Sequence, residues 1–237
     1  MRLIKLALVI LLLGEASAVS AGVIAENTRI IYNLDRKEQS FQFFNINDYP
    51  VLVQLWVDDG RVDGSPDKAI ESPVIPLPAI FKLKSGDAKN IRFVKVDDNL
   101  ANDRETLYWL NVYEVPPLPD TVDKSKDNAV LILTTRTQMK LFLRPGKLFS
   151  QASTMATNIS FKWDNESLAL INDSPFFVTI TSLMLVNSED KLEYNGMLAP
   201  FSQTAVDWKL KTQPDALIIT YIDDYGSQNE FTIKVKK

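Results

Sequence analysis

The chain has 237 residues, a net charge of -4, and neither histidine nor cysteine. The missing histidine excludes a Ser-His-Asp triad, a Cys-His pair and His-ligated zinc or haem, and the negative charge argues against a nucleic-acid partner. Without disulfides, stability must come from core packing, which a hydrophobic content of 46% permits. We therefore expect a well-packed globular protein that uses no cofactor and no metal.

The first 21 residues have the features of a secretory signal peptide. Arg2 and Lys5 give a positive start, and an unbroken apolar run covers residues 6–13. Small residues follow, with Val19-Ser20-Ala21 as a cleavage site and Ala16-Ser17-Ala18 as the alternative. The apolar run is shorter than the ~20 residues that cross a bilayer. The sequence predicts an exported, soluble protein without stable membrane insertion.

Short apolar strands separated by turns fill the first half of the remaining chain. Pro76 and Pro78 restrict residues 74–81 to an edge strand or an irregular segment, because proline cannot donate to a sheet ladder. About seven strands without a helical period over some 120 residues are typical of an immunoglobulin-like sandwich. The other strands that we predict before residue 130 cover residues 23–24, 28–32, 40–44, 50–57, 90–96 and 106–115.

Residues 130–145, reading VLILTTRTQMKLFLRP, form the longest predicted strand. Leu131, Leu133 and Thr135 fall on one face, and Val130 and Ile132 fall on the other. The first half of this strand is therefore apolar on both faces. Two interpretations remain open: a strand buried inside the sandwich, or an edge strand that lends one apolar face to another protein.

A second β-unit follows the sharp stop at Arg144-Pro145-Gly146, and residues 147–157 lack strand alternation. We expect a domain boundary here, with one immunoglobulin-like domain over 22–146 and another over 147–237. The short joint predicts an all-β molecule with an L or boomerang arrangement. The predicted strands of the second domain cover residues 160–163, 167–171, 176–186, 191–194, 204–210, 216–222 and 230–235.

Several motifs in order resemble one known family, the PapD-like periplasmic chaperones of chaperone–usher pili. The strongest is Asp103-Arg104-Glu105 followed by Trp109-Leu110-Asn111-Val112 and Val115-Pro116-Pro117. The resemblance covers essentially the whole chain after the signal peptide. The other motifs are Thr28-Arg29-Ile30-Ile31-Tyr32, Lys140-Leu141-Phe142-Leu143-Arg144-Pro145 and Asp223-Asp224-Tyr225-Gly226.

The resemblance implies a chaperone that lends a strand to incomplete pilus subunits, both pilins and adhesin, in the Gram-negative periplasm. It caps their open apolar groove and delivers them to an outer-membrane usher. No bond is made or broken, so the protein is not expected to be an enzyme. A homodimer that caps its own donor strand is a further expected state of the free protein.

The resemblance also implies roles for individual residues. Arg29 and Lys140 would hold the terminal carboxylate of the subunit, since a guanidinium and an ammonium both suit that group. Leu131, Leu133 and Thr135 would be the donated face, with Thr135 smaller than the apolar residue expected there. An ionic cluster that fixes the angle between the domains would consist of Glu105, Arg144 and Asp224. Solvated surface charges remain the alternative for both ionic sets.

Two other functional classes are consistent with a secreted all-β chain. An extracellular adhesion or structural module would not require Arg29 or Lys140, and repeats or an anchor would be expected. A secreted β-sandwich hydrolase is disfavoured because histidine and cysteine are both missing. Adjacent aspartates, such as Asp58-Asp59 and Asp97-Asp98, are typical of solvated turns and do not predict calcium binding.

Overall fold

The structure is a computed structural model, and it describes residues 22–66, 72–118, 131–164, 167–186, 188, 190–210 and 212–236. The predicted signal peptide and Val130 lie outside these ranges. No helix in the described ranges is long and apolar enough to cross a bilayer.

Two β-sandwiches build the molecule, which is the architecture predicted from the strand spacing. In the first, one sheet has the order β1-β3-β7-β5 and the other β2-β9-β8-β4-β6. All neighbouring strands are antiparallel except β2 and β9, which run parallel with Ile30 beside Leu141. The strands are β1 (Val23–Ala25), β2 (Ile30–Asn33), β3 (Glu38–Asn45), β4 (Val51–Asp58), β5 (Val74–Leu77), β6 (Ile80–Leu83), β7 (Ala88–Lys95), β8 (Thr106–Val115) and β9 (Thr135–Arg144).

The second sandwich has a sheet with the order β10-β11-β14 and another with the order β13-β12-β15-β16. A 3₁₀ helix, η1 (Gly146–Asn158), connects β9 to it, and the sequence pattern had not predicted that helix. The strands are β10 (Ile159–Asp164), β11 (Ser167–Asn172), β12 (Val178–Leu185), β13 (Lys191–Leu198), β14 (Ser202–Val206), β15 (Ala216–Ile222) and β16 (Gln228–Lys234).

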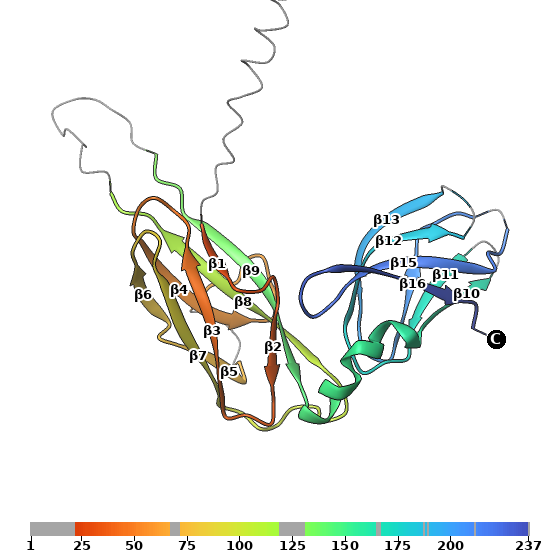
Figure 1. The fold of residues 1–237 in the computed structure, drawn as a ribbon, viewed down its shortest axis with the longest axis horizontal. Helices are drawn as coiled ribbons and strands as arrows, with labels where there is room; N and C mark the ends of the chain where they lie inside the picture. The colour runs from red at the N-terminus through yellow and green to blue at the C-terminus, as the bar shows by residue number, and fades with distance from the viewer. Residues whose placement is uncertain are drawn as a thin grey trace, which may run out of the picture.

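Each sandwich has its own hydrophobic core, because alternate residues of facing sheets point inward. In the first core Phe41 and Phe93 meet edge to face at 5.2 Å between ring centres. In the second, Phe161 and Phe176 are buried. The sandwiches meet where β9 passes into η1 and diverge at their other ends, so the molecule is V-shaped (Figure 1).

Most predicted strands agree with the observed ones to within a few residues, and two need comment. The segment 74–81 lies at sheet edges, as its prolines predict, but it forms two strands in different sheets, β5 and β6, separated by Pro78, and Ala79 between them accepts a hydrogen bond from Leu55 N. Strand β9 begins at Thr135, not at the predicted Val130. Its neighbour β8 is stopped by Pro116-Pro117, so Glu114–Thr135 is the last pair of the ladder.

Candidate functional site

The outer edge of β9 is open along its first half. Strand β8 pairs with β9 from Thr135 to Leu143, whereas β2 pairs only with residues 141–144 on the opposite edge. In the described ranges, no strand pairs with residues 135–140 on that edge. A strand edge with unpaired N–H and C=O groups is a template to which another extended chain can bind.

The segment just before β9 is apolar and exposed. Leu131 is 82% exposed and Leu133 is 69% exposed, so neither belongs to the core of this protein. The interpretation of these leucines as core residues is therefore wrong. Tyr113 donates a hydrogen bond to the hydroxyl of Thr134 at 3.1 Å, which holds the segment beside β8. Large apolar side chains exposed in a row are typical of a surface that binds another protein.

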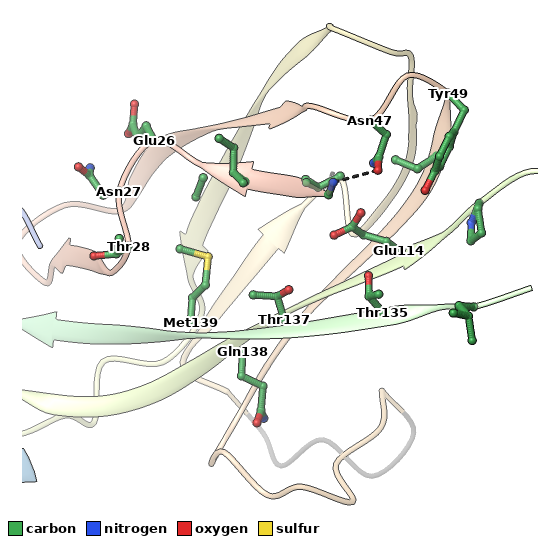
Figure 2. A pocket seen from close by; sticks show the side chains of 17 residues that line it. Glu26, Asn27, Thr28, Asn47, Tyr49, Glu114, Thr135, Thr137, Gln138 and Met139 are labelled. Atoms are coloured by element: carbon green, nitrogen blue, oxygen red, sulfur yellow. Dashed lines mark hydrogen bonds between the residues drawn. The ribbon is translucent and has the colours of Figure 1, made fainter. Parts of the chain in front are cut away.

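A groove of about 560 Å³ lies between this strand and β1. Figure 2 shows Thr135, Thr137 and Met139 of β9 along one side, with Glu26 and Asn27 on the opposite side. Leu133 also lines the groove. The groove follows the open edge of β9, so a chain that paired with this edge would place its side chains against it.

Arg29 and Lys140 lie next to one another at the base of the open edge. Arg29 directly precedes Ile30, and Lys140 directly precedes Leu141. Because Ile30 pairs with Leu141, the pairing of β2 with β9 places the two cations side by side. Each reaches a neutral acceptor in the second domain. Arg29 Nη1 lies 3.3 Å from the carbonyl oxygen of Ile222, and Lys140 Nζ lies 3.0 Å from the hydroxyl of Thr179.

The charge of this cation pair is only partly compensated. Burial lowers the pKa of Lys140, and the nearby positive charge of Arg29 lowers it further. Burial also lowers the pKa of Arg29, against the opposing effect of Asp224. Its Nε is buried and has no hydrogen-bond partner in the described residues. A carboxylate entering here would relieve the repulsion and provide the missing acceptor.

The second predicted ionic set lies deeper in the joint. Arg144 Nε contacts Glu105 Oε1 at 2.7 Å, and its two terminal nitrogens contact the two oxygens of Asp224 at 2.5 and 2.7 Å. The Arg144 guanidinium lies over the rings of Phe149 and Phe176 at 5.2 and 5.1 Å. Burial would lower the pKa of Arg144, but its bonds to Asp224 and Glu105 outweigh that effect and raise it.

Glu105 carries a second set of contacts across the joint. Its main-chain nitrogen donates to the carbonyl of Pro175 at 2.9 Å, and its Oε2 accepts from Phe177 N at 2.7 Å. The rings of Phe142 and Phe177 lie 5.8 Å apart. These bonds connect β8 and β9 to the start of the second sandwich, so the joint is a packed interface.

Sequence reasoning did not identify three parts of this site. Thr179 and the carbonyl of Ile222 contact the cation pair but carry no charge, and their proximity follows only from how the domains pack. Arg136, on β9, donates hydrogen bonds to the carbonyls of Val62 and Gly64. That contact attaches the β4–β5 loop to the start of the open strand. The sequence gives no sign of this contact beyond a charged residue at position 136 of a predicted strand.

An open strand edge, an apolar groove beside it and two cations at its base together define a protein that binds extended polypeptides. Two family models match the chain: the PapD N-terminal domain of pili and flagellar-assembly chaperones over residues 22–148, and the PapD C-terminal domain of pili assembly chaperones over residues 154–233. The chain therefore belongs to the family of PapD-like pili assembly chaperones.

Individual relatives agree with this family. The chaperone protein HifB of Haemophilus influenzae is 30% identical over 217 residues, which cover 91% of this chain and 88% of HifB. The CupB2 chaperone of Pseudomonas aeruginosa has a TM-score of 0.74 at 29% identity, covering 90% of this chain and 100% of its own. The SafB chaperone of Salmonella enterica, solved in complex with the SafA pilin, has the same fold, with a TM-score of 0.74 at 22% identity over 92% and 99% of the two chains.

Proposed function

We propose that this protein binds pilus subunits in the periplasm through strand donation and passes them to an outer-membrane usher. The observation that carries the proposal is the open edge of β9 with its exposed leucines beside two partly compensated cations. The relatives support it, because they are named chaperones and one was solved with a pilin. The protein holds its guest by non-covalent contacts alone and performs no chemical reaction.

This function assigns a separate task to each part of the chain. Residues 1–21 act as a cleaved signal peptide, residues 22–146 bind the subunit, and residues 147–237 form the second wall of the cleft between the domains, which Arg29 and Asp223 line from either side. The two separate cores and the two family matches support this division. Glu105, Arg144 and Asp224 hold the domains at the angle that forms the cleft.

The donated segment acts through backbone and side chains together. Leu131 and Leu133 enter the apolar groove of the subunit, and each contributes about 2 kcal/mol on burial. Thr135 contributes less, because its hydroxyl must remain hydrogen-bonded. Arg29 and Lys140 bind the terminal carboxylate of the subunit, which fixes the register in which the strands align.

The anchor is tested by co-purification with a co-expressed subunit. Arg29→Ala should reduce the yield of complex at least tenfold, because a charged hydrogen bond of about 1.5–3 kcal/mol is lost, and Lys140→Ala should act alike. Arg92→Ala, which removes an exposed arginine paired with Glu38, is the matched control and should leave the yield unchanged. Wild-type capture by either cation variant would show that these residues are not the anchor.

The donor segment needs a separate test. Leu133→Asp should weaken subunit capture strongly, because a carboxylate would enter an apolar groove. The free protein should unfold at an almost unchanged urea concentration, because Leu133 is exposed in it. Val96→Asp changes an exposed apolar residue outside the site and should leave both capture and stability unchanged. A loss of stability as large as the loss of capture would contradict the donor role.

A further inference from the structure

Gly22, which directly precedes β1, is held at its main-chain nitrogen. Gly22 N donates to Asn47 Oδ1 at 2.9 Å, and the carbonyl of Gly22 accepts from Ile46 N at 3.0 Å. The dashed line beside Asn47 in Figure 2 marks the first of these bonds. These contacts fix the start of β1 at the end of the groove.

The acceptor is rigidly oriented. Asn47 is buried, and its side-chain nitrogen donates to Asn45 Oδ1 at 2.8 Å. Asn45 is fixed in turn by its bonds to the carbonyls of Tyr49 and Leu83. Because the nitrogen of the Asn47 amide is engaged, its oxygen is the atom that faces Gly22 N.

A carboxylate also lies close to Gly22. Glu114 is only 6% exposed, and a Cβ added to Gly22 would lie 3.7 Å from Glu114 Oε1. Figure 2 shows the Glu114 side chain directed toward the bond at Asn47. In the described part of the chain, no lysine or arginine forms an ion pair with Glu114. Burial of a carboxylate is costly unless a positive charge lies near it.

A peptide nitrogen satisfies Asn47 but leaves the Glu114 carboxylate without a positive charge, whereas an amino terminus would serve both. A peptide N–H offers one donor and no charge, whereas an α-ammonium offers three donors and one positive charge and is mostly protonated at neutral pH.

We propose that Asn47 and Glu114 form a binding site for the mature amino terminus, which is the α-ammonium of Gly22. A signal peptidase would hydrolyse the Ala21–Gly22 peptide bond, with water supplying the oxygen of the new Ala21 carboxylate and Gly22 nitrogen becoming the ammonium. The inference rests on the export step of the proposed function. It selects the cleavage site after Ala21 over the alternative after Ala18.

The proposed site would link cleavage of the signal peptide to the shape of the groove beside β9. Glu114 is the ladder partner of Thr135, the first residue of β9. An ion pair between Gly22 and Glu114 would therefore join the start of β1 to the point where the open strand begins. Cleavage would complete one wall of the groove.

The first test is the amino-terminal sequence and intact mass of the protein isolated from the periplasm. A chain that begins at Gly22 supports the proposal. A chain that begins at Val19, or one that is not cleaved, overturns it. Subunit capture is measured separately, so its loss would count against the proposed function without affecting this assignment.

The second test separates an ion pair from a simple hydrogen bond. Four proteins are compared by urea unfolding: chains beginning at Gly22 and chains that retain Ser20-Ala21, each with Glu114 or with Glu114→Gln. The substitution should raise the unfolding constant about tenfold when the amine is at Gly22, and less than about twofold when it is displaced. Equal effects in both backgrounds would show that Glu114 does not bind the amino terminus.

Discussion

Arg144 and the pair Arg29–Lys140 lie in the same joint and differ in what surrounds their charge. Arg144 has two carboxylates along its edge and two aromatic rings near its guanidinium. Among the described residues, Arg29 and Lys140 donate only to a carbonyl and a hydroxyl, and the Asp224 carboxylate near Arg29 is already paired with Arg144. A cation that is paired with carboxylates of its own chain stabilises the fold. A cation that is bonded to neutral acceptors can still attract a carboxylate of another protein.

The largest expected difference between the two sites is in folding. Arg144→Met leaves the Glu105 carboxylate, with 1% of its side chain exposed, without its cation. We expect a loss of about 3–5 kcal/mol in the free energy of unfolding, measured by urea unfolding, and a changed interdomain angle in small-angle scattering. Arg92→Met removes an exposed ion pair and should cost less than about 1 kcal/mol. Equal losses would mean that Arg144 is not a structural cation.

A carboxylate placed beside Lys140 within the protein should compensate its charge, as Glu105 and Asp224 compensate the charge of Arg144. Thr179→Asp places an acid at the position that Lys140 Nζ already contacts at 3.0 Å. The free protein should gain about 1 kcal/mol of stability, and subunit capture should fall about tenfold because the ammonium is already neutralised. Thr179→Asn adds the same bulk without charge and should retain capture. If both variants capture subunit equally, charge competition does not operate at Lys140.

The smallest effect concerns pH. Because the folded pKa of Lys140 is lowered from 10.5, the unfolded chain binds more protons between the folded value and 10.5, and wild-type stability rises with pH across that interval. Lys140→Met should be more stable than wild type by about 0.5 kcal/mol at pH 7, and the difference should shrink as the pH approaches 10.5. Urea unfolding at both pH values measures it. A variant that is less stable at pH 7 would contradict the stated direction.

Sequence alone was sufficient for most of the fold. Alternating residues gave β8 and β15 with their observed bounds, because each strand is long and ends at a strong turn or proline signal. The start of β9 could not be predicted, because Leu131 and Leu133 have strand-forming character but no neighbouring strand to pair with. The helix η1 was missed although Leu148, Met155 and Ala156 lie at a helical spacing, because the segment is short and has neither a capping side chain at its start nor charges that mark its ends.

The site was predictable where a motif carried charge. Glu105, Arg144 and Asp224 were expected together, and the structure brings them into direct contact. Thr179 and Asn47 were not identified, because a hydroxyl or an amide has no sequence signature until packing places it beside a charge. The proposed amino-terminal site likewise depends on a fold that brings Gly22 close to Glu114 of β8.

The bonds from Arg136 to the β4–β5 loop end on main-chain oxygens of Val62 and Gly64. Since every residue type supplies such an oxygen, the side chains of this loop can be exchanged without losing the attachment. Gly60 and Gly64 are the exceptions, because an added Cβ would lie 2.4 Å from the Trp109 ring at Gly60 and 2.7 Å from Asp58 Oδ2 at Gly64. With both glycines kept, the described part of this loop tolerates new side chains beside the strand that binds the guest.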